Sequence, residues 1–216
     1  MNYGQVKRDA LNKIFSETIA GEPIASTYNN QADYEKAIPG YVNDAMMYIA
    51  TTVKKIPAIV RLDDLFVEEG DGYNVYQLPQ DCYKIMNGGL ILPFPKNPER
   101  IVSERYGQYR VYGGDQLWLP KNAPRGLQLE YYRYPIQLPE DPDDNMSLDN
   151  TPDTHGPIAF YVASQLVMYD DPFRYAALYN EWETRLGRIT EPVLTENTKV
   201  YDVYGFGNSF DYGWWG

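Results

Sequence analysis

The chain contains few of the residues from which active sites are most often built. Its 216 residues include one cysteine, Cys82, and one histidine, His155. A single cysteine excludes an intrachain disulfide and a zinc site made of cysteines. No nucleophile motif accompanies His155, and no Gly-rich phosphate-binding loop follows a predicted strand. We therefore predict that the chain is no enzyme and needs no cofactor or metal. We expect His155 to be a capping or surface histidine. We expect the Cys82 thiol to be buried and to act as a small hydrophobic side chain.

Long apolar runs are also missing. No stretch approaches the ~18 apolar residues of a membrane span, and the polar start Met1–Gln5 lacks the apolar centre of a signal peptide. A single thiol is compatible with a reducing compartment. We expect a soluble protein without a membrane partner.

Positive charge is scarce. Lys and Arg number 19 against 30 Asp and Glu, a formal net charge of −11. A protein that grips nucleic acid needs clustered Lys and Arg, so this balance argues against such a role. It is compatible with a protein past which DNA slides without sticking, and it is equally compatible with simple solubility.

The acidic clusters do not form a recognisable site. Asp141–Asn145 imitates the opening of a calcium-binding loop, but Met146 stands where glycine is needed and Pro152 where glutamate is needed. We interpret this segment as a solvated acidic linker. A second cluster, within residues 63–71, has nothing that sets the separation of a catalytic carboxylate pair.

Helical periodicity is confined to the two ends of the chain. One apolar stripe predicts a helix from Tyr3 to about Ala20, with Asn2 and Gln5 as a capping box. A second helical region spans Gln31–Lys55, and we expect a break at Pro39. A third predicted helix covers Ile158–Met168 and is apolar on nearly all sides, so we expect it to be the buried one. Asp153 or Thr154 is its expected cap. A fourth predicted helix begins at Pro172 and ends before Pro192.

Between these helices the apolar period changes to two. Tyr73–Leu78 and Leu127–Arg133 alternate, and Gly113–Asp115 separates two short strands as a hairpin turn would. The fold class is therefore predicted to be α+β: a four-helix core of two N-terminal and two C-terminal helices, a central antiparallel β insertion, and an extended C-terminal arm. The expected segments are residues 1–55 (N-terminal helices), 56–135 (β subdomain), 136–157 (Pro/Asp linker), 158–191 (C-terminal helices) and 192–216 (aromatic arm).

The arm, from Leu194 to Gly216, is predicted to need a partner surface. Glycines make its backbone costly to order, and its aromatics are unfavourable in water. The alternative is a disordered terminus, which is common at chain ends. Aromatic residues favour the partner surface, because they anchor protein interfaces and are usually scarce in disordered tails. The predicted binding residues are Tyr201, Tyr204, Phe206, Phe210, Tyr212, Trp214 and Trp215.

Several segments, in order and spacing, resemble one protein family. The chain is similar to the head–tail connector proteins of tailed bacteriophages, the adaptors that lie beneath the portal in short-tailed phages. The segments that carry the resemblance are Asn2–Lys7, Tyr28–Tyr34, Val42–Ala50, Leu78–Asp81, Pro157–Ala163 and Asp171–Pro172 through Tyr179–Trp182.

The resemblance implies a structural virion protein at the head–tail junction, assembled in the host cytoplasm. It implies a homo-oligomeric ring, typically twelvefold, that joins the portal protein to tail or nozzle proteins and extends the channel through which packaged DNA passes without specific binding. It also implies that the aromatic arm binds the portal. The alternative is a carbohydrate- or receptor-binding tail protein, since exposed Tyr and Trp also stack on sugars; such a protein would display its aromatics on the folded sheet.

Overall fold

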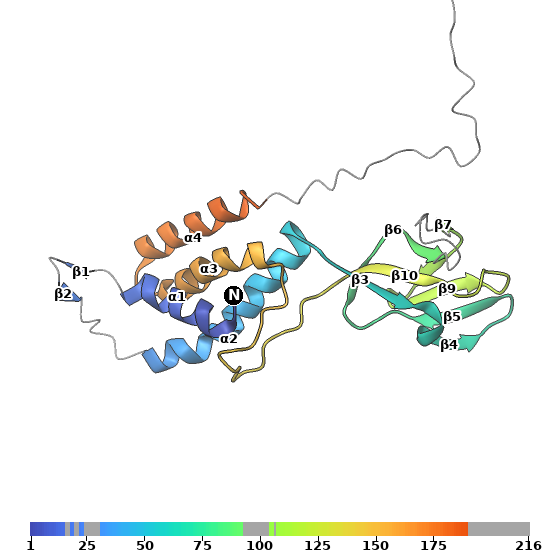
Figure 1. The fold of residues 1–216 in the computed structure, drawn as a ribbon, viewed down its shortest axis with the longest axis horizontal. Helices are drawn as coiled ribbons and strands as arrows, with labels where there is room; N and C mark the ends of the chain where they lie inside the picture. Colours follow the sequence, from blue (N-terminus) through green and yellow to red (C-terminus); the bar gives the residue numbers. More distant parts are fainter. Residues whose placement is uncertain (16–17, 20–21, 24–30, 93–103, 106, 190–216) are drawn as a thin grey trace, which may run out of the picture.

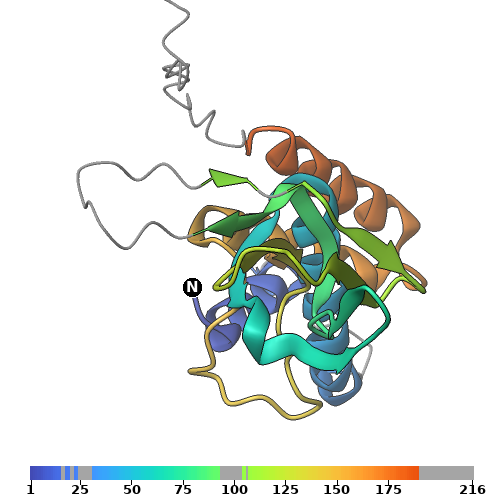
Figure 2. The same ribbon diagram turned by 90° about the vertical axis from the view of Figure 1, so that its right-hand side faces the viewer.

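The computed structural model describes residues 1–15, 18–19, 22–23, 31–92, 104–105 and 107–189. Within them, helices from both ends of the chain form one body, and two antiparallel sheets from its middle form a second body beside it (Figure 1). The predicted α+β class, with two N-terminal and two C-terminal helices that flank a β insertion in the sequence, is confirmed. Figure 2 views the same molecule along its length, from the β body.

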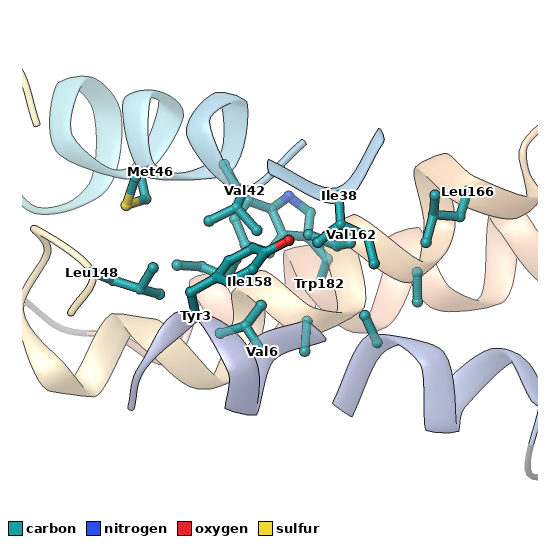
Figure 3. Packing of buried hydrophobic residues seen from close by; sticks show 14 of the residues in the cluster. Tyr3, Val6, Ile38, Val42, Met46, Leu148, Ile158, Val162, Leu166 and Trp182 are labelled. Atoms are coloured by element: carbon teal, nitrogen blue, oxygen red, sulfur yellow. The ribbon is translucent and has the colours of Figure 1, made fainter. Parts of the chain in front are cut away.

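Four helices build the first body: α1 (Tyr3–Phe15), α2 (Gln31–Tyr48), α3 (His155–Val167) and α4 (Pro172–Leu186). Helix α3 contacts each of the other three, and nine of its thirteen residues are buried. The prediction that the third helix is the central one is confirmed. Figure 3 shows Val6, Ile158, Val162 and Trp182 converging in this core.

The predicted helix starts depend on local hydrogen bonds that the structure contains. Asn2 and Gln5 exchange backbone-to-side-chain bonds of 2.9 Å each, so the capping box is present. The Asp171 carboxylate accepts a bond from the Arg174 amide, with Pro172 at the first helical position. Thr154 precedes α3 as expected, but its hydroxyl donates to the Thr151 carbonyl instead of capping the helix.

Two helix predictions are wrong. Helix α1 ends at Phe15 and not near Ala20, because Thr18–Ile19 (β1) pairs with Glu22–Pro23 (β2). Helix α2 continues through Pro39 without the expected break. Since Ile38 and Val42 on either side are fully buried, packing compensates for the hydrogen bond that proline cannot make. The irregularity comes later, as a π-helical turn at Ile49–Val53.

The β body contains two four-stranded sheets, where the sequence suggested one. The first has the order β3-β10-β6-β7, from Ile56–Arg61, Gln128–Arg133, Cys82–Leu92 and Glu104–Arg105. The second has the order β4-β5-β9-β8, from Phe66–Glu69, Tyr73–Gln77, Gln116–Pro120 and Arg110–Tyr112. All their pairings are antiparallel, and the hairpin turn between β8 and β9 has positive φ at Gly113 and Gly114.

Leucine and tyrosine side chains from both sheets share a second hydrophobic core. Its buried members include Leu90 and Leu129 from the first sheet and Leu117 and Leu119 from the second. Leu62, in the short 3-10 helix Leu62–Leu65 between β3 and β4, closes this core. The two sheets are thus held to each other by apolar packing and form one unit.

The segment that returns from β10 to α3 is fastened to the helices. Asn43 donates to the Leu138 carbonyl (3.0 Å) and accepts from its amide (2.7 Å), while Leu138 and Leu148 are buried in the helical core. Asp141, Asp143 and Asp144 remain exposed, as expected for an acidic linker. A linker anchored at both ends limits how far the β body can move relative to the helices.

One ion pair ties this linker to the sheet. Arg133 of β10 donates to Asp149 (Nη2–Oδ1, 2.7 Å), and Asp149 also accepts from the Ile136 amide at 2.6 Å. These hydrogen bonds, that of the Arg133 guanidinium first, lower the pKa of the Asp149 carboxyl. The pair therefore stabilises the fold while Asp149 is ionised.

We expect Asp149→Asn to lower the free energy of unfolding by about 1.5–3 kcal/mol at pH 7, the range for hydrogen bonds to charged groups. Because the folded-state pKa is depressed, this stabilisation is present above the unfolded value of about 3.9 and is lost as pH falls through the folded pKa. Urea titrations of both proteins between pH 7 and pH 3 check this: their difference should shrink with acid. An equal difference at every pH would contradict the proposed role of ionisation.

Candidate functional site

The aromatic residues predicted to bind the portal lie outside the described residues. This applies to the whole arm and to Tyr201, Tyr204, Phe206, Phe210, Tyr212, Trp214 and Trp215. The structure therefore neither tests their role nor places them.

The two residues singled out for possible chemistry have structural surroundings. His155 is the first residue of α3 and is buried, which corrects the expectation of a capping or surface histidine. Its Nε2 lies 2.9 Å from the Asn150 carbonyl oxygen, and burial lowers the pKa of the imidazole. Cys82 is half-buried against the β core, and burial raises the pKa of its thiol. Both features fit side chains that hold the fold together.

Charged side chains do not gather into a metal site in the described part of the chain. No group of three His, Cys, Asp or Glu residues there is arranged to hold an ion. In the same residues, no helix is both long and apolar enough to cross a bilayer. The features that stand out are surfaces.

The first surface is an aromatic row on the outer face of the second sheet. Trp118 of the inner strand β9 stacks on Tyr73 of β5, with ring centroids 4.4 Å apart and planes 7° apart. Tyr112 of β8 approaches the same indole at 4.9 Å. Strands β5 and β8 lie on opposite sides of β9, so the indole stands between two tyrosines. Cross-strand aromatic contacts of this kind stabilise a sheet.

This arrangement leaves little free ring surface. Both faces of Trp118 are covered by tyrosines, and Gly70 lies so close to Tyr73 that an added Cβ would stand 2.4 Å from the phenol ring. A sugar stacks on an accessible ring face, and Tyr112 is the most exposed of the three residues, at 63%. The row is therefore better suited to fixing the sheet than to stacking on a sugar.

A depression adjoins the row. It has a volume of about 470 Å³, and its lining includes Tyr73, Gln108, Arg110 and Trp118. Gln108 and Arg110 are among the residues that bring polar side chains to this lining. The depression combines aromatic and hydrogen-bonding groups in a concave site.

The second surface consists of the two edges of the same sheet. Every residue of β4 and every residue of β8 is exposed, including Phe66 and Val67 on one edge and Val111 and Tyr112 on the other. Acidic residues surround β4: Asp63, Asp64, Glu68, Glu69 and Asp71. Edge β8 instead carries the cation Arg110. An exposed apolar edge with unpaired backbone groups invites another strand.

The third surface is the turn between α3 and α4. Met168, Tyr169 and Phe173 are exposed there, the two aromatics almost completely. Tyr34 donates a hydrogen bond to the Asp170 carboxylate beside them, so the turn itself is held to α2. Exposed aromatics on an ordered turn are typical of a contact surface.

None of these three surfaces was predicted from the sequence. Tyr112 and Trp118 were recognised as strand residues, but their faces follow only from the pairing of β5, β9 and β8. For the sheet edges, the signal was the contrast between Arg110, on a predicted short strand, and Glu68–Glu69, in an acidic segment that was predicted to be a loop and that the structure places in β4. That contrast becomes informative only when the strand order is known.

Comparison with known proteins agrees with the resemblance found in the sequence. A family model described as SU10 adaptor protein matches residues 1–201, which include all four helices and both sheets. No curated protein matches the chain.

Proposed function

The chain belongs to the SU10 adaptor protein family of phage adaptor proteins, and we propose that it forms a ring between the portal and the tail of a virion. In this role it extends the DNA channel, provides a platform for tail or nozzle proteins, and catalyses no reaction. The observation that carries the proposal is the family match, because it spans both the helical body and the β body.

The surface of the molecule supports an assembled state. Exposed apolar residues occur on the sheet edges and at the α3–α4 turn, at opposite ends of the molecule (Figure 1). A subunit of a closed ring needs two different contact surfaces, since each copy meets its neighbours in a head-to-tail manner. The net charge of −11 suits a channel through which DNA slides without being held.

The arm completes the proposal. Four glycines are interspersed among its seven aromatics, so the backbone can follow a foreign surface while the rings anchor it. We propose that this arm contacts the portal, and that the folded residues form the ring and face the tail.

A second candidate, binding of a carbohydrate receptor, is favoured by one observation. Tyr73, Trp118 and the neighbouring depression place aromatic and polar groups together on the folded sheet. The covered faces of Trp118 weigh against it, because sugar stacking needs an open ring face. We therefore rank it second.

Mixing the purified protein with its cognate portal ring tests the first proposal. Native mass spectrometry should detect the portal ring carrying one fixed number of copies of this protein. Stable complexes that carry fewer copies should not appear. A glycan array separates the candidates further: selective glycan binding that is lost in Tyr112→Ala, together with no complex on the portal, would favour the receptor-binding reading.

A further inference from the structure

The two edges of the second sheet match each other in detail. In the order β4-β5-β9-β8, strands β4 and β8 each have no neighbouring strand on one side among the described residues. Val111 and Tyr112 are 47% and 63% exposed on β8, and Phe66 and Val67 are 51% and 52% exposed on β4. Both edges therefore present apolar side chains beside unpaired backbone groups.

The register places complementary residues at the two ends of the same row. Arg110 pairs with Trp118, Trp118 with Val75, and Val75 with Glu68. Paired residues share a face of a sheet, so this row runs across one face from a cation on edge β8 to an anion on edge β4. Neither Arg110 nor Glu68 has an ion-pair partner among the described residues.

The adjacent row is apolar at both ends. Val111 pairs with Leu117, Leu117 with Tyr76, and Tyr76 with Phe66. The irregularity in the pairing of β4 lies between Phe66 and Glu68, which places Val67 beside both rows. One row thus ends in opposite charges, and the next ends in two exposed hydrophobic side chains.

Strand direction allows the sheet to continue into another molecule. The four strands alternate in direction, so β8 runs opposite to β4. If the β4 edge of a second copy lay beside β8, the new pair would be antiparallel like the others. In register, Arg110 would lie across from Glu68 of the second copy, and Val111 across from Phe66 of that copy.

Charge selects this pairing over the symmetric ones. A two-fold β4–β4 pairing centred on Glu68 and Glu69 would bring carboxylates together, although Lys121 already pairs with Glu69 (2.6 Å). A two-fold β8–β8 pairing centred on Arg110 would bring two guanidinium groups together. Like charges directly opposite each other are destabilising in a sheet, whereas opposite charges are favourable. A head-to-tail contact between different edges is also the kind that closes into a ring.

We propose that strand β8 of one subunit pairs with strand β4 of the next, so that the second sheet continues from copy to copy around the ring. The inference rests on the proposed function, because it assigns a contact within that ring. Since three or four residues bury too little surface to hold a stable interface alone, the pairing sets the register of a larger contact.

Disulfide trapping tests this pairing directly. We would place Arg110→Cys and Glu68→Cys in one chain that also carries Cys82→Ser, so that only the introduced thiols react. Residues opposite each other in an antiparallel pair have Cα atoms about 4.5–5.5 Å apart, within the range a disulfide bridges. Within one chain the same two positions are separated by three strand spacings, about 14 Å, so they cannot join.

On portal-bearing particles, mild oxidation should give a ladder of covalent multimers that extends beyond the dimer and disappears with reductant. Arg110→Cys alone should give no band larger than a dimer. A chain with Arg110→Cys and Asp64→Cys, whose second cysteine precedes β4, should give no ladder. A complete ring without a ladder from the first pair would overturn the edge pairing and leave the proposed function intact; particles that acquire no ring would overturn both.

Charge exchange provides an independent readout. Arg110→Glu and Glu68→Arg should each lower ring occupancy at least tenfold at a fixed protein concentration. The chain carrying both substitutions should regain occupancy, and so should an equimolar mixture of the two single variants, because every β8–β4 contact in an alternating ring is then complementary. Single variants that assemble like the wild type, or a double variant that stays as defective as the singles, would contradict the proposal.

Discussion

Replacing Ile49 with aspartate should abolish folding. Ile49 begins the π-helical turn that ends α2, and its side chain is fully buried in the helical core. An unpaired charge there costs several kcal/mol or more, against a total stability of about 5–15 kcal/mol for a domain of ordinary size. Loss of the helical circular dichroism signal at 25 °C, or recovery of the protein only as aggregates, would be the expected result.

A matched control lies on the same helical body. Phe173 is 91% exposed at the start of α4, where a carboxylate is favourable for the helix dipole, so Phe173→Asp should fold normally. Leu178 of α4 packs against the same core but is only half-buried. Leu178→Asp should therefore destabilise less. A native, cooperatively unfolding Ile49→Asp variant would contradict the assignment of this core.

The helices were predictable because their signals are local. The capping box of Asn2 and Gln5 and the Asp171–Pro172 start of α4 depend on residues within four positions of each other. So does the apolar stripe that makes α3 central. The failures at Ala20 and Pro39 have the same physical origin: β1–β2 pairing and tertiary packing outweigh intrinsic preference.

The sheets were harder, because strand order depends on contacts between distant residues. The alternation in Tyr73–Leu78 and Leu127–Arg133 gave the strands, but nothing in it shows that β5 and β10 belong to different sheets. The ion pair of Arg133 with Asp149 joins a strand to a segment described only as an acidic linker. The complementary edges around Arg110 and Glu68 were equally beyond a reading of the sequence.

Deleting the residues from Tyr201 onward should abolish attachment to portal-bearing particles while leaving the protein folded. Among the described residues, the members of both hydrophobic cores lie between Tyr3 and Ile189, and the truncation leaves all of these in place. Burial of each large aromatic contributes roughly 1.5–3 kcal/mol before ordering costs, and the truncation removes all seven. We expect at least a hundredfold loss of binding in a sedimentation assay with such particles.

The contribution of individual rings can be separated from that of chain length. Trp214→Ala with Trp215→Ala should weaken attachment strongly, because the two indoles are the largest side chains of the arm. Asn208→Ala with Ser209→Ala, which keeps the length and every aromatic, should attach like the wild type. If the truncated protein bound the particles with unchanged affinity, the arm would have no role in attachment.

We propose that this chain forms a closed ring on the portal. Cryo-electron microscopy of tailless, portal-bearing particles incubated with the protein would show such a ring. We expect an added ring of density below the portal, coaxial with the channel, with one folded subunit per repeat and its second sheets joined edge to edge. Particles whose portal vertex is unchanged at saturating protein, or that carry isolated subunits in place of a ring, would contradict it.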